Sequence, residues 1–121
     1  MYFTLFPNFH PCGAFNRINY RFRPVGTKVD ECLMECIYTE DFEGDERPAP
    51  AEYIELGLDQ EWIELIPEIG NLARVFQQDS FNLPKVQKGL ETFRADGLTL
   101  TKYQEVKIRH WHAMAEKFIT R

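Results

Sequence analysis

Residues 72–90 of the chain read LARVFQQDSFNLPKVQKGL, and they indicate a helix with one buried face. Apolar side chains recur there in steps of three and four, which is the spacing of a helical stripe. The position that completes this period is Asp79. A carboxylate among hydrophobic side chains loses hydration unless it is paired, hydrogen-bonded or bound to a metal. Asp79 is therefore a candidate functional residue, and the apolar members of the stripe are Leu72, Phe76, Leu83, Val86 and Leu90.

Two structural interpretations of Asp79 stay open beside the functional one. Pro84 is expected to break or kink the helix, so that the stripe near Asp79 faces solvent. Alternatively, Asp79 accepts hydrogen bonds from backbone donors that the break sets free. The pattern alone does not choose between these roles and a functional carboxylate.

Length and composition indicate at most one globular domain, since the chain has 121 residues, 44% hydrophobic and 14% aromatic. The 14 basic and 19 acidic residues give a net charge of −5, which argues against a nucleic-acid partner. No apolar run approaches the roughly 20 residues of a membrane span. The N-terminus lacks the basic flank and small-residue cleavage site of a signal peptide, so we expect a cytoplasmic protein.

Cysteine usage argues against a disulfide framework and against a structural zinc site. The three cysteines, Cys12, Cys32 and Cys36, are odd in number and form no Cys-x-x-Cys pair. Cys32 and Cys36 are expected to share one face of a strand, where a free cysteine packs as a small hydrophobe.

The first part of the chain predicts antiparallel strands. Residues 3–9 indicate a buried strand that Pro7 or Pro11 ends. Residues 17–23 alternate between polar and apolar side chains, as a half-buried strand does. After a turn at 24–27, residues 32–39 are expected to return as its hairpin partner, in which Glu35 faces an arginine.

The second part of the chain predicts a connector and helices. Residues 40–51 are acidic and contain proline, so their charges are expected in solvent. A short helix around Trp62 is one option for 52–66, and Pro67 suits the first turn of the Asp79 helix. Thr101 and Gln104 predict a capping box before a final helix, whose core stripe is Ile108, Trp111, Met114, Ala115 and Phe118. Together, the predicted strands and helices indicate an α+β fold.

Four blocks of sequence carry a resemblance to a known family. They are FPNFH (6–10), RFRP (21–24), FQQD (76–79) with VQKGL (86–90), and YQE (103–105) with RHWH (109–112). In order and spacing they are similar to the C-terminal part of the catalytic domain of Rieske-type aromatic-ring-hydroxylating dioxygenase alpha subunits. The blocks cover nearly the whole chain, and no single block is decisive.

The resemblance implies a helix-grip (START/Bet v1-like) fold around a mononuclear Fe(II) site. In this family two histidines and one aspartate hold the iron, and the histidines lie upstream of the matching region. Asp79 occupies the ligand position, shortly before a glutamine that matches Gln87. Candidate walls of the substrate pocket, with plain core packing as their alternative, are Leu72, Phe76, Phe81 and Leu83.

The resemblance also implies an activity and a set of partners. Electrons pass from NAD(P)H through a reductase, in some members with a ferredoxin, to a Rieske [2Fe-2S] cluster. They then reach the mononuclear iron, which uses dioxygen to hydroxylate an aromatic or other apolar substrate. Family members assemble with other alpha subunits and in some cases with a beta subunit.

The chain departs from the family pattern in two respects. Many members have two adjacent aspartates preceded by a glutamate, whereas here Gln77 and Gln78 precede Asp79 and Ser80 follows it. Neither the Cys-x-His and Cys-x-x-His pairs of the Rieske cluster nor the histidine pair of the iron site is present, and the histidines His10, His110 and His112 do not match that pair. We therefore expect residues 1–121 to be the C-terminal portion of one catalytic domain, without its Rieske domain and upstream half, and inactive by itself.

Two other functions remain candidates. A non-enzymatic helix-grip module that binds an apolar ligand or a partner protein accounts for the aromatic strands and the final helix, but not for Asp79. An assembly segment is the third candidate, because the arginine face of residues 17–23 suits an acidic neighbour. A histidine pair and a Rieske motif in frame upstream of Met1 would distinguish the oxygenase from both.

Overall fold

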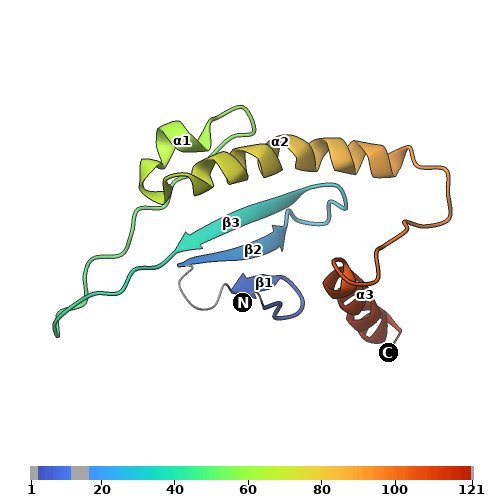
Figure 1. Cartoon of the computed structure of the whole chain (residues 1–121), viewed down its shortest axis with the longest axis horizontal. Coiled ribbons are helices and arrows are strands. Elements are labelled where there is room, and N and C mark those ends of the chain that lie inside the picture. Colours follow the sequence, from blue (N-terminus) through green and yellow to red (C-terminus); the bar gives the residue numbers. More distant parts are fainter. Residues whose placement is uncertain (1–2, 12–16, 121) are drawn as a thin grey trace. The chain divides into compact units, whose positions relative to one another are not determined.

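The computed structural model describes residues 3–11 and 17–120 (Figure 1). Cys12 lies outside these residues, so the prediction about it stays untested. The strands are β1 (Phe9–Pro11), β2 (Ile18–Pro24) and β3 (Cys32–Tyr38), and the helices are α1 (Trp62–Leu65), the 3-10 helix η1 (Pro67–Ile69), α2 (Leu72–Glu91) and α3 (Val106–Ile119). A small antiparallel sheet with helices confirms the predicted α+β class.

The chain divides into two compact units. The sheet unit consists of Met1–Arg47 and Gly97–Arg121 and contains the three strands and α3. The helical unit is Pro48–Asp96 and contains α1, η1 and α2. In the part of the chain that the structure describes, no helix combines the length and the apolar character needed to cross a membrane.

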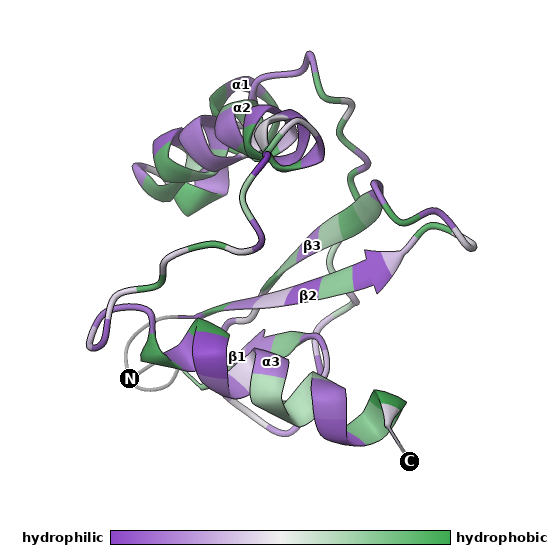
Figure 2. Cartoon of the chain, turned by 90° about the vertical axis from the view of Figure 1, so that its right-hand side faces the viewer, coloured by the Kyte–Doolittle hydropathy of each residue, from purple (hydrophilic) through white to green (hydrophobic). Residues whose placement is uncertain are grey.

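The sheet has the antiparallel order β1-β2-β3, and its centre is the predicted hairpin. Ile18 pairs with Tyr38, Arg21 with Glu35 and Pro24 with Cys32. Polar and apolar residues alternate along β2, as Figure 2 shows, and this places Ile18 in the core while the arginines stay exposed. The turn after β2 includes Gly26 at φ 59°, a left-handed conformation that glycine adopts without strain.

The predicted buried strand over 3–9 is wrong in position and in burial. Leu5 N donates to the Phe9 carbonyl at 2.8 Å and Phe9 N donates to the Leu5 carbonyl at 3.1 Å, so the chain turns between them. Pro7 lies inside this turn, which suits a residue that has no N–H to donate. The strand proper starts at Phe9, and Phe3 and Leu5 are exposed.

Glu35 forms an ion cluster with two arginines of β2. Its carboxylate accepts hydrogen bonds from Arg21 Nε and, at 2.6 Å, from Arg23 Nη2. Both arginines lie beside Glu35 because two-residue spacing keeps them on one face of the strand. Hydrogen bonds from Arg21 and then Arg23 lower the pKa of Glu35 from its ordinary value of 4.5 to about 2. The predicted pairing of Glu35 with an arginine is confirmed.

The final helix, α3, packs against the segment before β1. Trp111 Nε1 donates to the Pro7 carbonyl at 2.6 Å. The Phe6 ring lies 5.9 Å from Trp111 and 4.9 Å from Phe118, measured between ring centroids. Trp111, Met114 and Ala115 of the predicted stripe are half-buried, whereas Ile108 and Phe118 are exposed.

The start of α3 differs from the predicted capping box. The reciprocal hydrogen bonds join Thr101 to Glu105, with Glu105 N donating to Thr101 Oγ1 at 3.3 Å and Thr101 N donating to the Glu105 carboxylate. Gln104 is not the partner, and the helix begins only at Val106. These reciprocal hydrogen bonds therefore order the turn before the helix and do not cap the first residues of the helix.

In the helical unit, α2 continues through Pro84, and the predicted break is wrong. Proline removes one i to i−4 hydrogen bond but does not prevent the remaining ones. Pro84 and its neighbours in the sequence are exposed. Pro67 begins η1, not α2, and Gly70 at φ 57° turns the chain between the two.

Trp62 forms the core of the helical unit. Its ring lies 5.1 Å from that of Phe76, and both side chains are buried together with Ala73. Trp62 Nε1 donates to Ser80 Oγ at 3.0 Å, and Trp62 N donates to Gln77 Oε1 at 2.9 Å. The predicted short helix at Trp62 is confirmed, and the acidic residues 40–51 are exposed as expected.

Glu35→Gln tests the ion cluster of the sheet. A carboxyl group whose pKa is lowered on folding stabilises the folded state above its unfolded pKa, and this contribution is lost as the pH falls through the folded value. The window therefore runs from about 4.5 down to about 2. We expect the urea midpoint of the β2 and β3 amide signals to fall across this window in the wild type, and to fall less in Glu35→Gln.

Glu40→Gln is the matched control, because Glu40 meets Arg17 at 3.5 Å with most of its side chain exposed. This variant is expected to keep the pH dependence of the wild type. Identical pH dependence in Glu35→Gln and the wild type would show that the cluster does not stabilise the sheet.

Phe76→Ala and Phe81→Ala test the core of the helical unit, because they make the same Phe-to-Ala change at a buried and at an exposed position of α2. Phe76 is 0% exposed, so its truncation is expected to cost about 3–5 kcal/mol and to release α1 from α2. Phe81 is 64% exposed and lies under the Lys85 ammonium, so its truncation is expected to cost less than about 1 kcal/mol. Urea unfolding followed by the Trp62 indole signal measures both, and equal losses would contradict a core centred on Trp62 and Phe76.

Candidate functional site

Asp79 lies near the middle of α2 and is exposed to solvent. Its side-chain carboxylate makes no hydrogen bond or ion pair with any residue that the structure describes. The structure rules out backbone donors freed by a helix break, because α2 is unbroken at Pro84. The other structural interpretation, a solvent-facing stripe, is correct for the helical unit, although a break is not its cause.

The side chains around Asp79 form an exposed apolar face on α2. Val75 lies four residues before Asp79, and Leu83 and Val86 lie four and seven residues after it, so all three are on the same side of the helix as Asp79. Leu90 follows one turn after Val86. We call Val75, Leu83, Val86 and Leu90 the outer face of α2; their side chains are 46%, 49%, 57% and 43% exposed. The buried face of α2 is a neighbouring one, where Ala73 and Phe76 are buried and Phe76 packs against Trp62.

The four predicted pocket walls do not share one environment. Phe76 is buried against Trp62, and Leu72 is half-buried. Phe81 carries the Lys85 ammonium 2.9 Å from its ring centroid and, two residues after Asp79, lies on a different side of the helix. The structure therefore brings Leu83 to the outer face beside Asp79 and places Phe81 away from it.

The described residues do not form a complete metal-binding cluster. Among residues 3–11 and 17–120, no group of three or more histidine, cysteine, aspartate or glutamate side chains is arranged to hold an ion. Asp79 offers one exposed carboxylate, which suits one position in an iron site with oxygen and imidazole ligands. The described residues thus fit a single ligand of a facial triad and do not fit the complete triad.

The three histidines lie in the sheet unit, and their environments differ. His10 Nδ1 is 3.2 Å from Thr4 Oγ1, and its ring meets Phe22 edge-on at 5.6 Å. Burial first, and the charge of Lys107 second, lower the pKa of His10 below 6.5. His110 and His112 are exposed on α3, and the ring of His112 contacts Trp111 at 5.3 Å.

The cysteines of β3 differ in burial. Cys36 is half-buried, and burial raises the pKa of its thiol to about 12. It therefore stays protonated near neutral pH, which makes it a poor nucleophile and a poor metal ligand. Cys32, at the start of β3, is exposed, so the prediction of core packing is correct only for Cys36.

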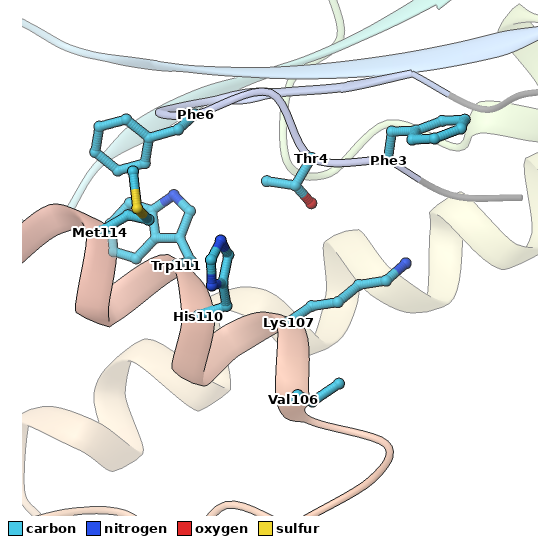
Figure 3. A pocket seen from close by; sticks show the side chains of 8 residues that line it. All are labelled: Phe3, Thr4, Phe6, Val106, Lys107, His110, Trp111 and Met114. Atoms are coloured by element: carbon cyan, nitrogen blue, oxygen red, sulfur yellow. The ribbon is translucent and has the colours of Figure 1, made fainter.

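Sequence reasoning missed two groups of residues. Gln77 and Ser80 hold Trp62 by hydrogen bonds. Each follows a buried residue, Ala73 or Phe76, by four positions, and this spacing could have indicated a second face of the helix. A cavity in the sheet unit was also missed, and it includes Lys107 and Trp111 (Figure 3). Lys107 and Trp111 are four residues apart on α3, so the sequence could have predicted that they share a helix face. It could not have predicted that the segment around Phe3 lies opposite them.

Comparisons of the chain with models of protein families, with curated proteins and with solved structures found no match.

Proposed function

We propose that the chain is the C-terminal part of the catalytic domain of a Rieske-type non-haem iron oxygenase, in which Asp79 is one iron ligand. The observation that carries this proposal is a carboxylate with no partner among the described residues, set into the exposed apolar outer face of α2. An apolar helix face is ordinarily buried, and a carboxylate buried with it requires a cation or hydrogen bonds. An iron ligand meets this requirement.

The proposed domain is a helix-grip fold, which is finer than the α+β class. The antiparallel hairpin of β2 and β3 and the long helix α2 supply element types that such a fold contains. In this proposal the outer face of α2 and the edges of the three-stranded sheet are covered by residues of the longer protein. Pairing of a sheet edge satisfies backbone groups that otherwise favour association with other chains.

The proposed reaction divides between the bound iron and the protein. The iron, when bound, supplies the dioxygen chemistry, with electrons from NAD(P)H delivered through a reductase and the Rieske cluster. Asp79 contributes a negative charge that helps to retain a divalent cation, and an unbroken α2 fixes the position of its backbone. Val75 and Leu83, one turn to either side, would shield the carboxylate from water once this face is covered in the longer protein, and they offer an apolar surface to an aromatic substrate.

Asp79→Ala in the longer protein, which in this proposal supplies two histidines and the Rieske cluster, tests the assignment. We expect loss of most mononuclear iron and a fall in single-turnover product of more than about 100-fold, since even changing a residue that hydrogen-bonds to a metal ligand costs about 10–100-fold. The absorbance of the [2Fe-2S] cluster should stay unchanged. Iron analysis and product detection after one turnover measure these effects.

Asp96→Ala is the matched control, because Asp96 is an exposed aspartate in the segment after α2. It should retain both iron and product. Full iron content in Asp79→Ala would remove Asp79 from the ligand set. Absence of an in-frame histidine pair upstream would favour the non-enzymatic module that binds an apolar ligand.

A further inference from the structure

The outer side of β3 is an open edge of the sheet (Figure 1). On the opposite side, residues 3–5 pair with part of β1, since Phe3 N donates to the Pro11 carbonyl at 3.2 Å and Leu5 exchanges two hydrogen bonds with Phe9. Within the described part of the sheet unit, β2 is the only helix or strand that contacts β3. The seven residues of β3 therefore have a neighbouring strand on one side only.

The register shows which backbone groups of β3 point to the open edge. Thr39 N donates to the Arg17 carbonyl at 2.9 Å, so residue 39 belongs to a hydrogen-bonded pair. Such pairs alternate with non-hydrogen-bonded ones along an antiparallel ladder, so the odd-numbered residues of β3 bond to β2. The even-numbered residues direct their N–H and C=O groups outward, and they are Cys32, Met34, Cys36 and Tyr38. No described residue hydrogen-bonds with these groups, which are a template for another strand.

The strand β3 lacks the features that commonly protect an edge. Its sequence, CLMECIY, contains neither proline nor lysine. Its one charged residue, Glu35, is bound to Arg21 and Arg23 of β2. The carboxylate is thereby neutralised within the sheet, and it does not repel a strand that approaches from the open side.

The side chains beside the outward groups are apolar. Met34 and Cys36 are half-buried, and they pair with Phe22 and Tyr20 of β2. Residues that pair directly lie on the same face of a sheet. A further strand that places apolar side chains opposite Met34 and Cys36 therefore enlarges this apolar face.

The chain that follows β3 is strongly acidic. Residues 40–46 carry five carboxylates and no basic side chain, and all of them are exposed. Glu40 meets Arg17 at 3.5 Å, and the other carboxylates of this segment form no ion pair with a described residue. In antiparallel pairing, the residues just before an incoming strand lie beside this segment. Lysine or arginine at that place gains charge complementarity.

A second copy of the chain is a poor partner for this edge. Antiparallel pairing of two β3 strands brings residues 40–46 of one copy toward Asp30 and Glu31 of the other, because these two residues precede β3. Like charges that face each other across a strand pair are destabilising. The edge therefore favours a strand of different sequence.

We propose that the open edge of β3 pairs with an antiparallel strand in which basic residues precede alternating polar and apolar residues. Its backbone bonds with the even-numbered residues of β3, and its basic residues meet residues 40–46. In the proposed function this strand belongs to the longer protein, so the inference rests on that proposal for the source of the strand. It does not depend on Asp79 or on iron.

The test is a titration of the full chain with a peptide of Lys-Arg-Lys followed by four Thr-Val repeats. Hydrogen exchange of the β3 amides, followed by NMR, is the readout. In the free chain we expect fast exchange at Met34 and Cys36 and slow exchange at Leu33, Glu35 and Ile37. The peptide should slow Met34 and Cys36 about tenfold when its free concentration is about ten times its Kd, by mass action.

Two N-methylated forms of this peptide are matched controls, because they have the same charge and nearly the same composition. The valines lie opposite the even-numbered residues of β3, so methylation of the valine nitrogens removes the N–H groups that bond to β3. Methylation of the threonine nitrogens blocks only the far edge of the peptide. We expect the threonine-methylated form to slow exchange at Met34 and Cys36, and the valine-methylated form to leave it fast.

The charge complementarity is tested by neutralising two exposed carboxylates at a time. Asp41→Asn with Glu43→Gln is expected to weaken the threonine-methylated peptide at least about threefold at low salt, since each exposed ion pair contributes little. Glu55→Gln with Asp59→Asn is the matched control, because both residues are exposed but belong to the helical unit. It should leave the affinity unchanged.

Three results would overturn the proposal. They are unchanged exchange at Met34 and Cys36 with the threonine-methylated peptide, equal effects of the two methylated peptides, and equal losses of affinity in the two double variants. Each leaves the proposed role of Asp79 to its own experiment, and loss of that role would not alter the binding of the peptide.

Discussion

The small number of buried hydrophobic side chains is the constraint on which the structure of this chain depends. Among the described residues, the buried hydrophobic side chains are Ile18, Trp62, Ala73 and Phe76. With so little apolar surface removed from water, directed contacts of a few aromatic residues hold each unit. In the helical unit the indole of Trp62 packs on Phe76 and donates to Ser80. In the sheet unit the indole of Trp111 donates to the Pro7 carbonyl.

The same constraint leaves apolar surface for further interactions. The outer face of α2 carries four exposed aliphatic side chains around a carboxylate. The cavity between residues 3–6 and α3 presents aromatic side chains beside a lysine. A cation therefore suits the carboxylate on the outer face of α2.

The charges of the β2–β3 hairpin are compensated within the chain. Arg21 and Arg23 are paired with Glu35, which keeps that carboxylate ionised to low pH and joins β2 to β3. This arrangement stabilises a hairpin whose charged partners both belong to the described residues.

The sequence by itself determined the elements that depend on local periodicity. Alternation along 17–23 predicts β2 and its pairing with β3, and spacings of three and four predict α2 and α3, because strand and helix repeats are properties of neighbouring residues. Asp79 was also found from such a repeat. Only the tertiary structure decided which faces are buried. Trp62, which belongs to another helix, packs on Phe76 beside the buried Ala73, whereas the predicted stripe of α2 is largely exposed and Asp79 faces solvent. Likewise, the cavity at Lys107 needs residues from both ends of the chain, which no local pattern connects. Burial depends on two surfaces that meet, and a repeat within one element describes only one of them.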